Sequence, residues 1–171
     1  DDEGRKKYVV ENFKDFNPGN ESGIGGTNND EDRVTKFTYN QLSLPKQQIA
    51  LMATPQITRY IYEFEMSASG CGIRRPELLR AIIFPDSADV FDDAGIWSGG
   101  FTSGTDHVSY TYYYNGARKT ATDQRVVVHT YSYDYLGRLK DVDADTTTNP
   151  LPSGVDSSVV KIGYTYDQSG R

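Results

Sequence analysis

The sequence is poor in the residues that build covalent or metal-bound frameworks, with one cysteine, two histidines and two methionines among 171 residues. This scarcity excludes a disulfide scaffold, a cysteine-rich zinc site and a haem-attachment motif. No run of about 18 apolar residues is present, so no membrane-spanning helix is expected. The net charge of −6 argues against a nucleic-acid partner, because nucleic acids are bound by basic surfaces.

Tyrosine is abundant instead, with 13 copies beside seven phenylalanines and one tryptophan. Many tyrosines alternate with polar residues, and four stretches show this pattern: Tyr60, Tyr62 and Phe64; Val108, Tyr110, Tyr112 and Tyr114; Val127, His129, Tyr131 and Tyr133; and Val160, Ile162, Tyr164 and Tyr166. A period of two with aromatic and β-branched residues is typical of half-buried strands. A further strand is expected over residues 78–84, preceded by at most one helical turn. The sequence therefore predicts an all-β fold.

Three long polar stretches interrupt this pattern, at about residues 17–32, 87–106 and 143–158. Each is rich in residues that favour turns and loops, such as Gly, Ser, Pro, Thr, Asn and Asp. We expect them as insertions in a single segment that covers residues 1–171. The middle stretch also contains four large apolar residues, so it is expected to fold back over an edge or a face of the sheet.

A short motif of the form Y-D-x-x-G-R recurs along the chain. Complete copies are formed by Tyr133, Asp134, Gly137 and Arg138, and by Tyr166, Asp167, Gly170 and Arg171. A copy without its tyrosine is formed by Asp1, Gly4 and Arg5. Degenerate copies begin at Tyr39 and Tyr112, and residues 60–63 keep only the strand half. Such repetition indicates a repeat architecture, and the shortest spacings between motif tyrosines, 21 and 23 residues, fit one hairpin per repeat.

The residue types of the motif are those of a tight turn rather than of a catalyst. Aspartate at the first position and glycine at the fourth are favoured in a type I turn, because aspartate accepts hydrogen bonds from the turn backbone and glycine relieves its exit. A type I turn followed by a left-handed glycine is a common hairpin connection. The tyrosine is then predicted to end one strand, and the arginine to begin the next. Asp134 and Arg138 are expected to pair across the turn, as are Asp167 and Arg171.

On these motifs, together with residues 82–87 and 123–134, the sequence resembles the Rhs/YD-repeat family. The resemblance implies a large protein whose β-hairpins wind into a continuous curved sheet, here with long irregular loop insertions. In some relatives the sheet closes into a hollow shell around a toxic C-terminal polypeptide, and in others it is a cell-surface or adhesion scaffold. The activity of the toxin relatives resides in a variable segment after the repeats, and nothing in this sequence looks like that segment.

A search for catalytic, metal or cofactor sites gives only isolated candidates: Cys71, His107, His129, the pair Asp92 and Asp93, the glycines at 23–26, and Asp141, Asp143 and Asp145. Cys71 lacks a second cysteine, and residues 23–26 lack the lysine of a phosphate loop. The three aspartates look like the start of a calcium loop, but Thr146 and Pro152 stand where glycine and glutamate are required. One histidine is expected to begin a strand and the other to pack across strands. We therefore expect no enzyme, no cofactor and no bound metal.

The motif copies at residues 1–5 and 167–171 lie in phase, 166 positions apart. We therefore expect one super-repeat of a longer array, whose first and last strands are open edges that pair with neighbouring copies in the same chain or head-to-tail in a fibre. The expected function is a non-enzymatic structural segment of a large secreted or cell-surface protein. Two alternatives remain open: part of a hollow shell around a C-terminal toxin, or an extracellular module whose tyrosines stack on surface glycans.

Overall fold

A computed structural model describes residues 1–21, 32–52, 54–66, 75–85, 107–144, 160–167 and 169–170. These residues form strands β1 (Tyr8–Glu11), β2 (Arg33–Tyr39), β3 (Pro45–Leu51), β4 (Gln56–Tyr62), β5 (Leu79–Ile83), β6 (His107–Tyr112), β7 (Arg118–Thr122), β8 (Val128–Tyr133), β9 (Leu139–Ala144) and β10 (Lys161–Gly163), with one short 3-10 helix, η1 (Glu63–Glu65). The helix is far too short to cross a membrane, and no other helix occurs in the described part of the chain. The predicted all-β class is confirmed.

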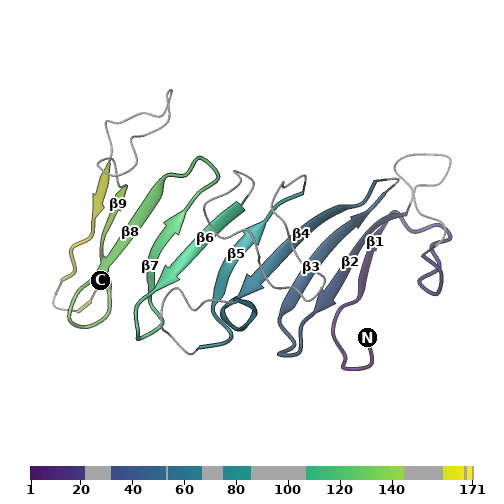
Figure 1. Ribbon diagram of the computed structural model, residues 1–171, viewed down its shortest axis with the longest axis horizontal. Helices are drawn as coiled ribbons and strands as arrows, with labels where there is room; N and C mark the ends of the chain where they lie inside the picture. Colours follow the sequence, from purple (N-terminus) through teal and green to yellow (C-terminus); the bar gives the residue numbers. More distant parts are fainter. Residues whose placement is uncertain are drawn as a thin grey trace.

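The ten strands form one antiparallel sheet in which spatial order equals chain order, from β1 to β10. Figure 1 shows them side by side in a single row, with the two chain termini at opposite ends. Every neighbouring pair is a hairpin or a simple up-and-down connection. Strands β1 and β10 therefore pair on one side only within the described residues, so the sheet has two open edges.

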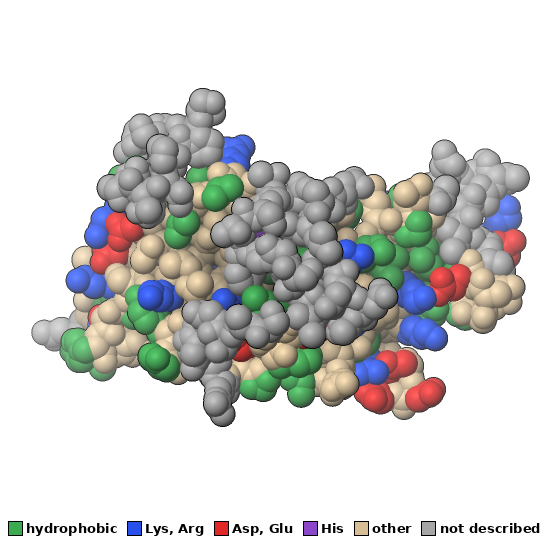
Figure 2. All heavy atoms as spheres, in the orientation of Figure 1, with side chains coloured by type: hydrophobic (Ala, Val, Ile, Leu, Met, Phe, Trp, Pro, Cys, Tyr) green, Lys and Arg blue, Asp and Glu red, His purple; other side chains and the backbone are tan. Residues whose placement is uncertain are grey.

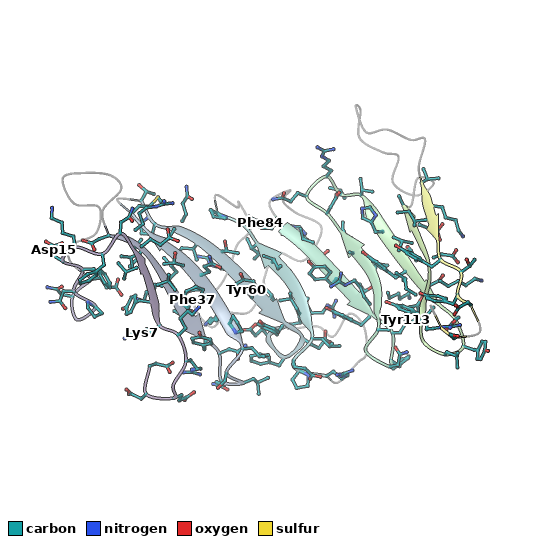
Figure 3. All side chains as sticks on the ribbon, turned by 180° about the vertical axis from the view of Figure 1, so that it is seen from behind. Lys7, Asp15, Phe37, Tyr60, Phe84 and Tyr113 are labelled. Atoms are coloured by element: carbon teal, nitrogen blue, oxygen red, sulfur yellow. The ribbon has the colours of Figure 1, made fainter. Side chains whose placement is uncertain are left out.

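The up-and-down order separates the connections into two sets. The motif turns, at residues 1–5, 40–44, 113–117 and 134–138, lie along the lower edge of the sheet in Figure 1. The chain leaves β1, β5 and β9 at the opposite edge, so the three predicted insertions all depart from that side. Figure 3, seen from behind, shows Tyr113 near the motif-turn edge and Phe84, which follows β5, toward the other.

The boundaries of the predicted insertions differ in part from the structure. Strand β9 continues to Ala144, so Asp143 lies in a strand rather than in the loop expected from residue 143. Its backbone is held there because Asp143 pairs with Thr130 on one side and with Lys161 on the other. Asn17 forms an isolated β-bridge and residues 18–21 form turns, whereas 22–31, 86–106 and 145–159 lie outside the described residues. The strand expected at 78–84 is present as β5.

Alternation fails at four aromatic residues that were expected to continue a strand, and two of them, Tyr164 and Tyr166, lie beyond the end of β10 at Gly163. Tyr114 lies in a turn with 84% of its surface exposed, and Phe64 lies in η1 with 40% exposed. In both cases the strand stops at the preceding motif tyrosine, Tyr112 or Tyr62. The turn that follows then redirects the chain, so the next aromatic residue no longer points to the face of the sheet.

The four hairpins that follow a motif tyrosine, β2–β3, β4–β5, β6–β7 and β8–β9, each contain one extra residue on the return strand. In β8–β9, for example, Ser132 pairs with Asp141 and Tyr133 with Leu139, so Lys140 is left out of the register. The omitted residues of the four hairpins are all basic: Lys46, Arg80, Lys119 and Lys140. Such a bulge bends the strand and increases its twist. The same irregularity therefore recurs in all four hairpins.

Among the described residues, a cluster of buried apolar side chains lies in the middle of the sheet. Ile61, Ala81 and Ile83 are almost completely buried, and Ile61 pairs directly with Ala81 across β4 and β5. Close to them, the carboxylate of Glu63 and the guanidinium of Arg80 form an ion pair whose side chains are 6% and 3% exposed. In the described residues, the middle of the sheet therefore combines apolar packing with a buried ion pair.

Candidate functional site

The turn at residues 134–138 shows how the complete motif folds. The backbone N–H of Gly137 donates to the carbonyl of Asp134 at 2.9 Å, and the N–H of Asp134 donates to the carbonyl of Arg138 at 2.9 Å. Gly137 has a φ of 79°, in the left-handed region that glycine adopts without strain. This is the closure of a three-residue hairpin loop, a type I turn followed by a left-handed residue.

The carboxylate of Asp134 fixes this turn from the inside. Its Oδ1 accepts from the backbone N–H groups of Leu136 and Arg138, both at 2.9 Å. Its Oδ2 accepts from Nε of Arg138 at 2.7 Å, and Nη2 of the same guanidinium lies at 2.7 Å. Burial acts to raise the pKa of Asp134, but the hydrogen bonds from Arg138 and Leu136 outweigh it, so this pKa lies below its usual value.

The first motif copy has the same geometry. The N–H of Gly4 donates to the Asp1 carbonyl at 3.0 Å, and Asp1 Oδ1 accepts from the N–H groups of Glu3 and Arg5. The Arg5 guanidinium contacts Asp1 Oδ2 at 2.7 Å and Glu3 Oε2 at 2.6 Å. Acidic and basic side chains accordingly lie next to one another at the N-terminal end of the sheet, at the lower right of Figure 2.

The last complete copy also turns at its aspartate. The N–H of Gly170 donates to the Asp167 carbonyl at 3.0 Å, and Gly170 has a φ of 79°. Ser169 donates its N–H to Asp167 Oδ1 at 2.9 Å. Arg171, the arginine of this copy, lies outside the described residues.

The degenerate copies keep the turn with other side chains. Asn40 Oδ1 accepts from the N–H groups of Leu42 and Leu44 at 2.9 and 3.0 Å, as the aspartate does elsewhere. Ser43 replaces the glycine with a φ of 57°. In the copy after Tyr112, Gly116 keeps the left-handed φ of 86°, but Tyr113 replaces the aspartate, so no carboxylate caps the turn. The backbone closure is therefore less sensitive to sequence than the motif suggests.

One turn of this kind, at residues 123–127, does not match the sequence motif. Asp123 Oδ1 accepts from the N–H groups of Arg125 and Val127, both at 2.9 Å, and Val126 donates its N–H to the Asp123 carbonyl. This turn joins β7 to β8 at the edge opposite the motif turns. Val126 occupies the glycine position with a φ of 64°, which a β-branched residue rarely adopts. The aspartate was a detectable signal, but neither tyrosine nor glycine accompanied it.

The motif tyrosines fasten successive hairpins to one another. In four cases the phenol hydroxyl of a motif tyrosine donates to a backbone carbonyl of the preceding motif hairpin. The acceptor is the residue that follows the arginine position of that hairpin. The four bonds run from Tyr39 to Lys6 (2.7 Å), from Tyr112 to Leu79 (2.6 Å), from Tyr133 to Arg118 (3.0 Å) and from Tyr166 to Leu139 (2.6 Å). We call Tyr39, Tyr112, Tyr133 and Tyr166 the tyrosine row.

The motif arginines add a second link between hairpins. The guanidinium carbon of Arg5 lies 4.7 Å from the ring centre of Tyr39, and that of Arg138 lies 4.3 Å from the ring centre of Tyr166. Each arginine thus neutralises the aspartate of its own turn and stacks on the tyrosine of the next hairpin. A guanidinium over an aromatic face contributes about 0.5–1 kcal/mol at exposed sites.

A shallow pocket opens between the hairpins β6–β7 and β8–β9. Its volume is about 370 Å³, and its lining consists of Tyr112, Gly116, Arg118, Tyr131, Tyr133 and Leu139. Arg118 lies between two rings, 4.6 Å from the centre of Tyr110 and 5.8 Å from that of Tyr131. Burial raises the pKa of Tyr133, and the charge of Arg118 acts in the opposite direction. Sequence reasoning missed this pocket, because its residues come from two hairpins.

The remaining sequence candidates do not converge on a site. His107 begins β6, as expected, and is buried, whereas His129 lies in β8 with its Nε2 4.0 Å from Asp123 Oδ2. Asp141 and Asp143 both contact Nζ of Lys161, at 3.3 and 3.6 Å. Across the described ranges, no three His, Cys, Asp or Glu side chains gather in a way that could hold a metal ion. The other candidates lie outside the described residues: Cys71, Asp92, Asp93, Asp145 and the glycines at 23–26.

No protein-family model matches the chain, and no curated protein sequence matches it. Among solved structures, the chain is similar to one chain of the structure described as "Crystal Structure of TcdB2-TccC3-Cdc42". The sequence identity is 13% and the TM-score is 0.33, and the match covers 82% of this chain and 8% of that chain. The present chain thus spans a small fraction of the length of that protein. A likeness of this degree assigns neither a family nor a function.

Proposed function

We propose that this chain is a non-enzymatic structural segment of a large secreted or cell-surface YD-repeat protein, and that neighbouring copies extend its sheet at β1 and β10. The observation that carries the proposal is the tyrosine row, in which one hairpin is bonded to the next four times by the same pair of groups. A bond that repeats from hairpin to hairpin belongs to an array, since stacking units bury faces that one unit cannot bury alone.

The open edges support the same proposal. Phe37 donates its N–H to the Lys7 carbonyl at 2.9 Å, and in antiparallel pairing the bonded residues alternate along the strand. The N–H of Val10, which pairs with Val34, is therefore directed away from β2. Unpaired groups of this kind on an edge strand offer a template for another strand. At the other end β10 has only β9 as a partner among the described strands.

The test is the association of the full chain in solution, measured by sedimentation velocity over a range of concentrations. We expect concentration-dependent assemblies that grow without a fixed end point, because a head-to-tail contact that does not close makes a filament. Val10→Pro removes the outward N–H of β1 and is expected to shift the chain toward the monomer. Val10→Ala keeps that N–H and serves as the matched control. A wild-type chain that stays monomeric at its highest soluble concentration contradicts the proposal.

A further inference from the structure

The pocket beside Arg118 lies at the motif hairpin β6–β7, whose turn, like that of β2–β3, has lost both charged residues of the motif. Tyr113 stands in place of the aspartate and Ala117 in place of the arginine. Arginine reappears one position later, as Arg118, which is the first residue of β7 and lines the pocket. The charge of this hairpin is therefore displaced from the turn to the pocket.

The guanidinium of Arg118 has different neighbours from the guanidinium groups of the motif arginines. Arg138 contacts Asp134 at 2.7 Å, and Arg5 contacts Asp1 at 2.7 Å. Arg118 is exposed and contacts the rings of Tyr110 and Tyr131, and within the described residues no carboxylate lies in ion-pair distance of it. A planar guanidinium held between two rings keeps its N–H groups available for a bidentate bond to an anion.

The lining around this guanidinium suits a ligand with a ring. Tyr112, Tyr131 and Tyr133 contribute aromatic surface, and Gly116, which the guanidinium of Arg75 covers on one side, contributes backbone at the rim. The volume of about 370 Å³ is at the small end of the range for small-molecule sites, which favours one ring-sized group over an extended chain. Aromatic side chains combine an apolar face with a polar tip, a pairing that suits a sugar, which has both C–H and O–H groups.

We propose that this pocket binds the carboxylate of an acidic sugar, with Arg118 holding the carboxylate and the ring of Tyr131 packing against the pyranose. The proposal concerns side chains on the face of the sheet and is independent of strand pairing at β1 and β10. An acidic peptide is disfavoured as the ligand because its carboxylate would fill little of the aromatic surface.

The experiment is an NMR titration of the full chain with methyl β-glucuronide, methyl β-glucoside and sodium acetate as probes. We expect saturable binding of the glucuronide with a Kd of about a millimolar, and much weaker binding of the two other probes, each of which lacks one half of the recognised group. Acetate binding as strong as glucuronide binding would reduce the site to an anion site and overturn the sugar assignment. Stronger binding of a short polyglutamate peptide would overturn it in favour of a protein partner.

Variants separate recognition from folding. Arg118→Gln is expected to weaken glucuronide binding about tenfold or more, because a charge-assisted bond is lost. Arg118→Lys keeps the charge without the planar fork and is expected to lie in between. Arg5→Gln is the matched control, since Arg5 also stacks on a tyrosine but lies in the first hairpin and contacts Asp1. Unchanged binding in Arg118→Gln overturns the proposal, provided that its thermal unfolding matches that of Arg5→Gln; if Arg118→Gln unfolds, the Arg118→Lys titration decides.

Discussion

The hydroxyl of Tyr166 lies 2.6 Å from the carbonyl oxygen of Leu139, the residue that pairs with Tyr133 in the preceding hairpin. Tyr133 thus pairs with Leu139 within its own hairpin, and Tyr166 of the next hairpin bonds to the carbonyl of the same residue. The same relation holds between Tyr133 and Arg118, which pairs with Tyr112. Neighbouring hairpins are therefore connected by side-chain bonds as well as by the backbone ladder.

Removal of one hydroxyl from the tyrosine row should measure this connection. Tyr133→Phe keeps the ring and loses the bond to the Arg118 carbonyl, so we expect a loss of about 0.5–1.5 kcal/mol in the free energy of unfolding. Tyr135→Phe is the control, since Tyr135 is 93% exposed at the turn tip and should show no change. Urea unfolding followed by circular dichroism checks both, and equal effects would contradict a special role of the row.

The left-handed turn position allows a reciprocal test. Gly137→Ala adds a Cβ that meets no atom within 4 Å, so its expected cost of about 1–2 kcal/mol is that of the backbone conformation alone. Val126→Gly relieves the same conformation at φ 64° and is expected to stabilise the chain by up to about 1 kcal/mol, after the backbone entropy of glycine is subtracted. Thermal unfolding gives the sign of each change. A less stable Val126→Gly would show that the contacts of the valine side chain outweigh the strain.

The buried ion pair should respond more strongly than an exposed one. Arg80→Met leaves the carboxylate of Glu63 buried without its partner, and we expect a loss of about 3–5 kcal/mol. Arg75→Met breaks the pair with Glu77, whose side chains are both 46% exposed, and should cost at most about 1 kcal/mol. Chemical denaturation measures the difference between the two variants. If Arg80→Met does not fold, Glu63→Gln provides the milder change, and a difference near zero would contradict the prediction.

The loop before β2 should be sensitive to acid. Asp32 is 1% exposed and accepts from the N–H groups of Lys14 at 2.7 Å and Asp15 at 3.1 Å, and the bond from Lys14 is the main reason that its pKa lies below the usual 3.8. A carboxyl with a lowered folded-state pKa stabilises the fold above its unfolded pKa, and this contribution is lost as the pH falls through the lower value.

The free energy of unfolding of the wild type should therefore exceed that of Asp32→Asn by a constant amount near neutral pH. This difference should shrink in strongly acidic solution. Asparagine tolerates the φ of 49° at this position, so the substitution isolates the charge. Urea midpoints of both chains over a pH series check the expectation. A difference that stays the same below the usual pKa would show that the charge of Asp32 does not stabilise the loop.

The sequence predicted those features that depend on local residue pattern. Aromatic alternation indicated β6 and β8, and the aspartate and glycine of the motif indicated the turn at residues 134–138. Return strands such as β7, with the sequence RKTAT, were not predicted because apolar and polar residues do not alternate in them. Such a strand forms because it pairs with a strand on either side, here β6 and β8. The pocket beside Arg118 was not predicted because it depends on the contact between two hairpins.

The hairpin β4–β5 shows that the hydrogen bond that closes a motif turn does not fix the number of residues in the tip. Glu63 donates its N–H to the carbonyl of Leu78 at 2.9 Å. The equivalent bond in the hairpin β8–β9 runs from Asp134 to Arg138. Asp134 and Arg138 are four positions apart in the sequence, whereas Glu63 and Leu78 are fifteen positions apart. Tyr62 still pairs with Leu79 as Tyr133 pairs with Leu139. The length of the tip is thus uncoupled from the register of the strands. Insertions and deletions at a turn tip are therefore expected to leave the strand pairing of the sheet unchanged.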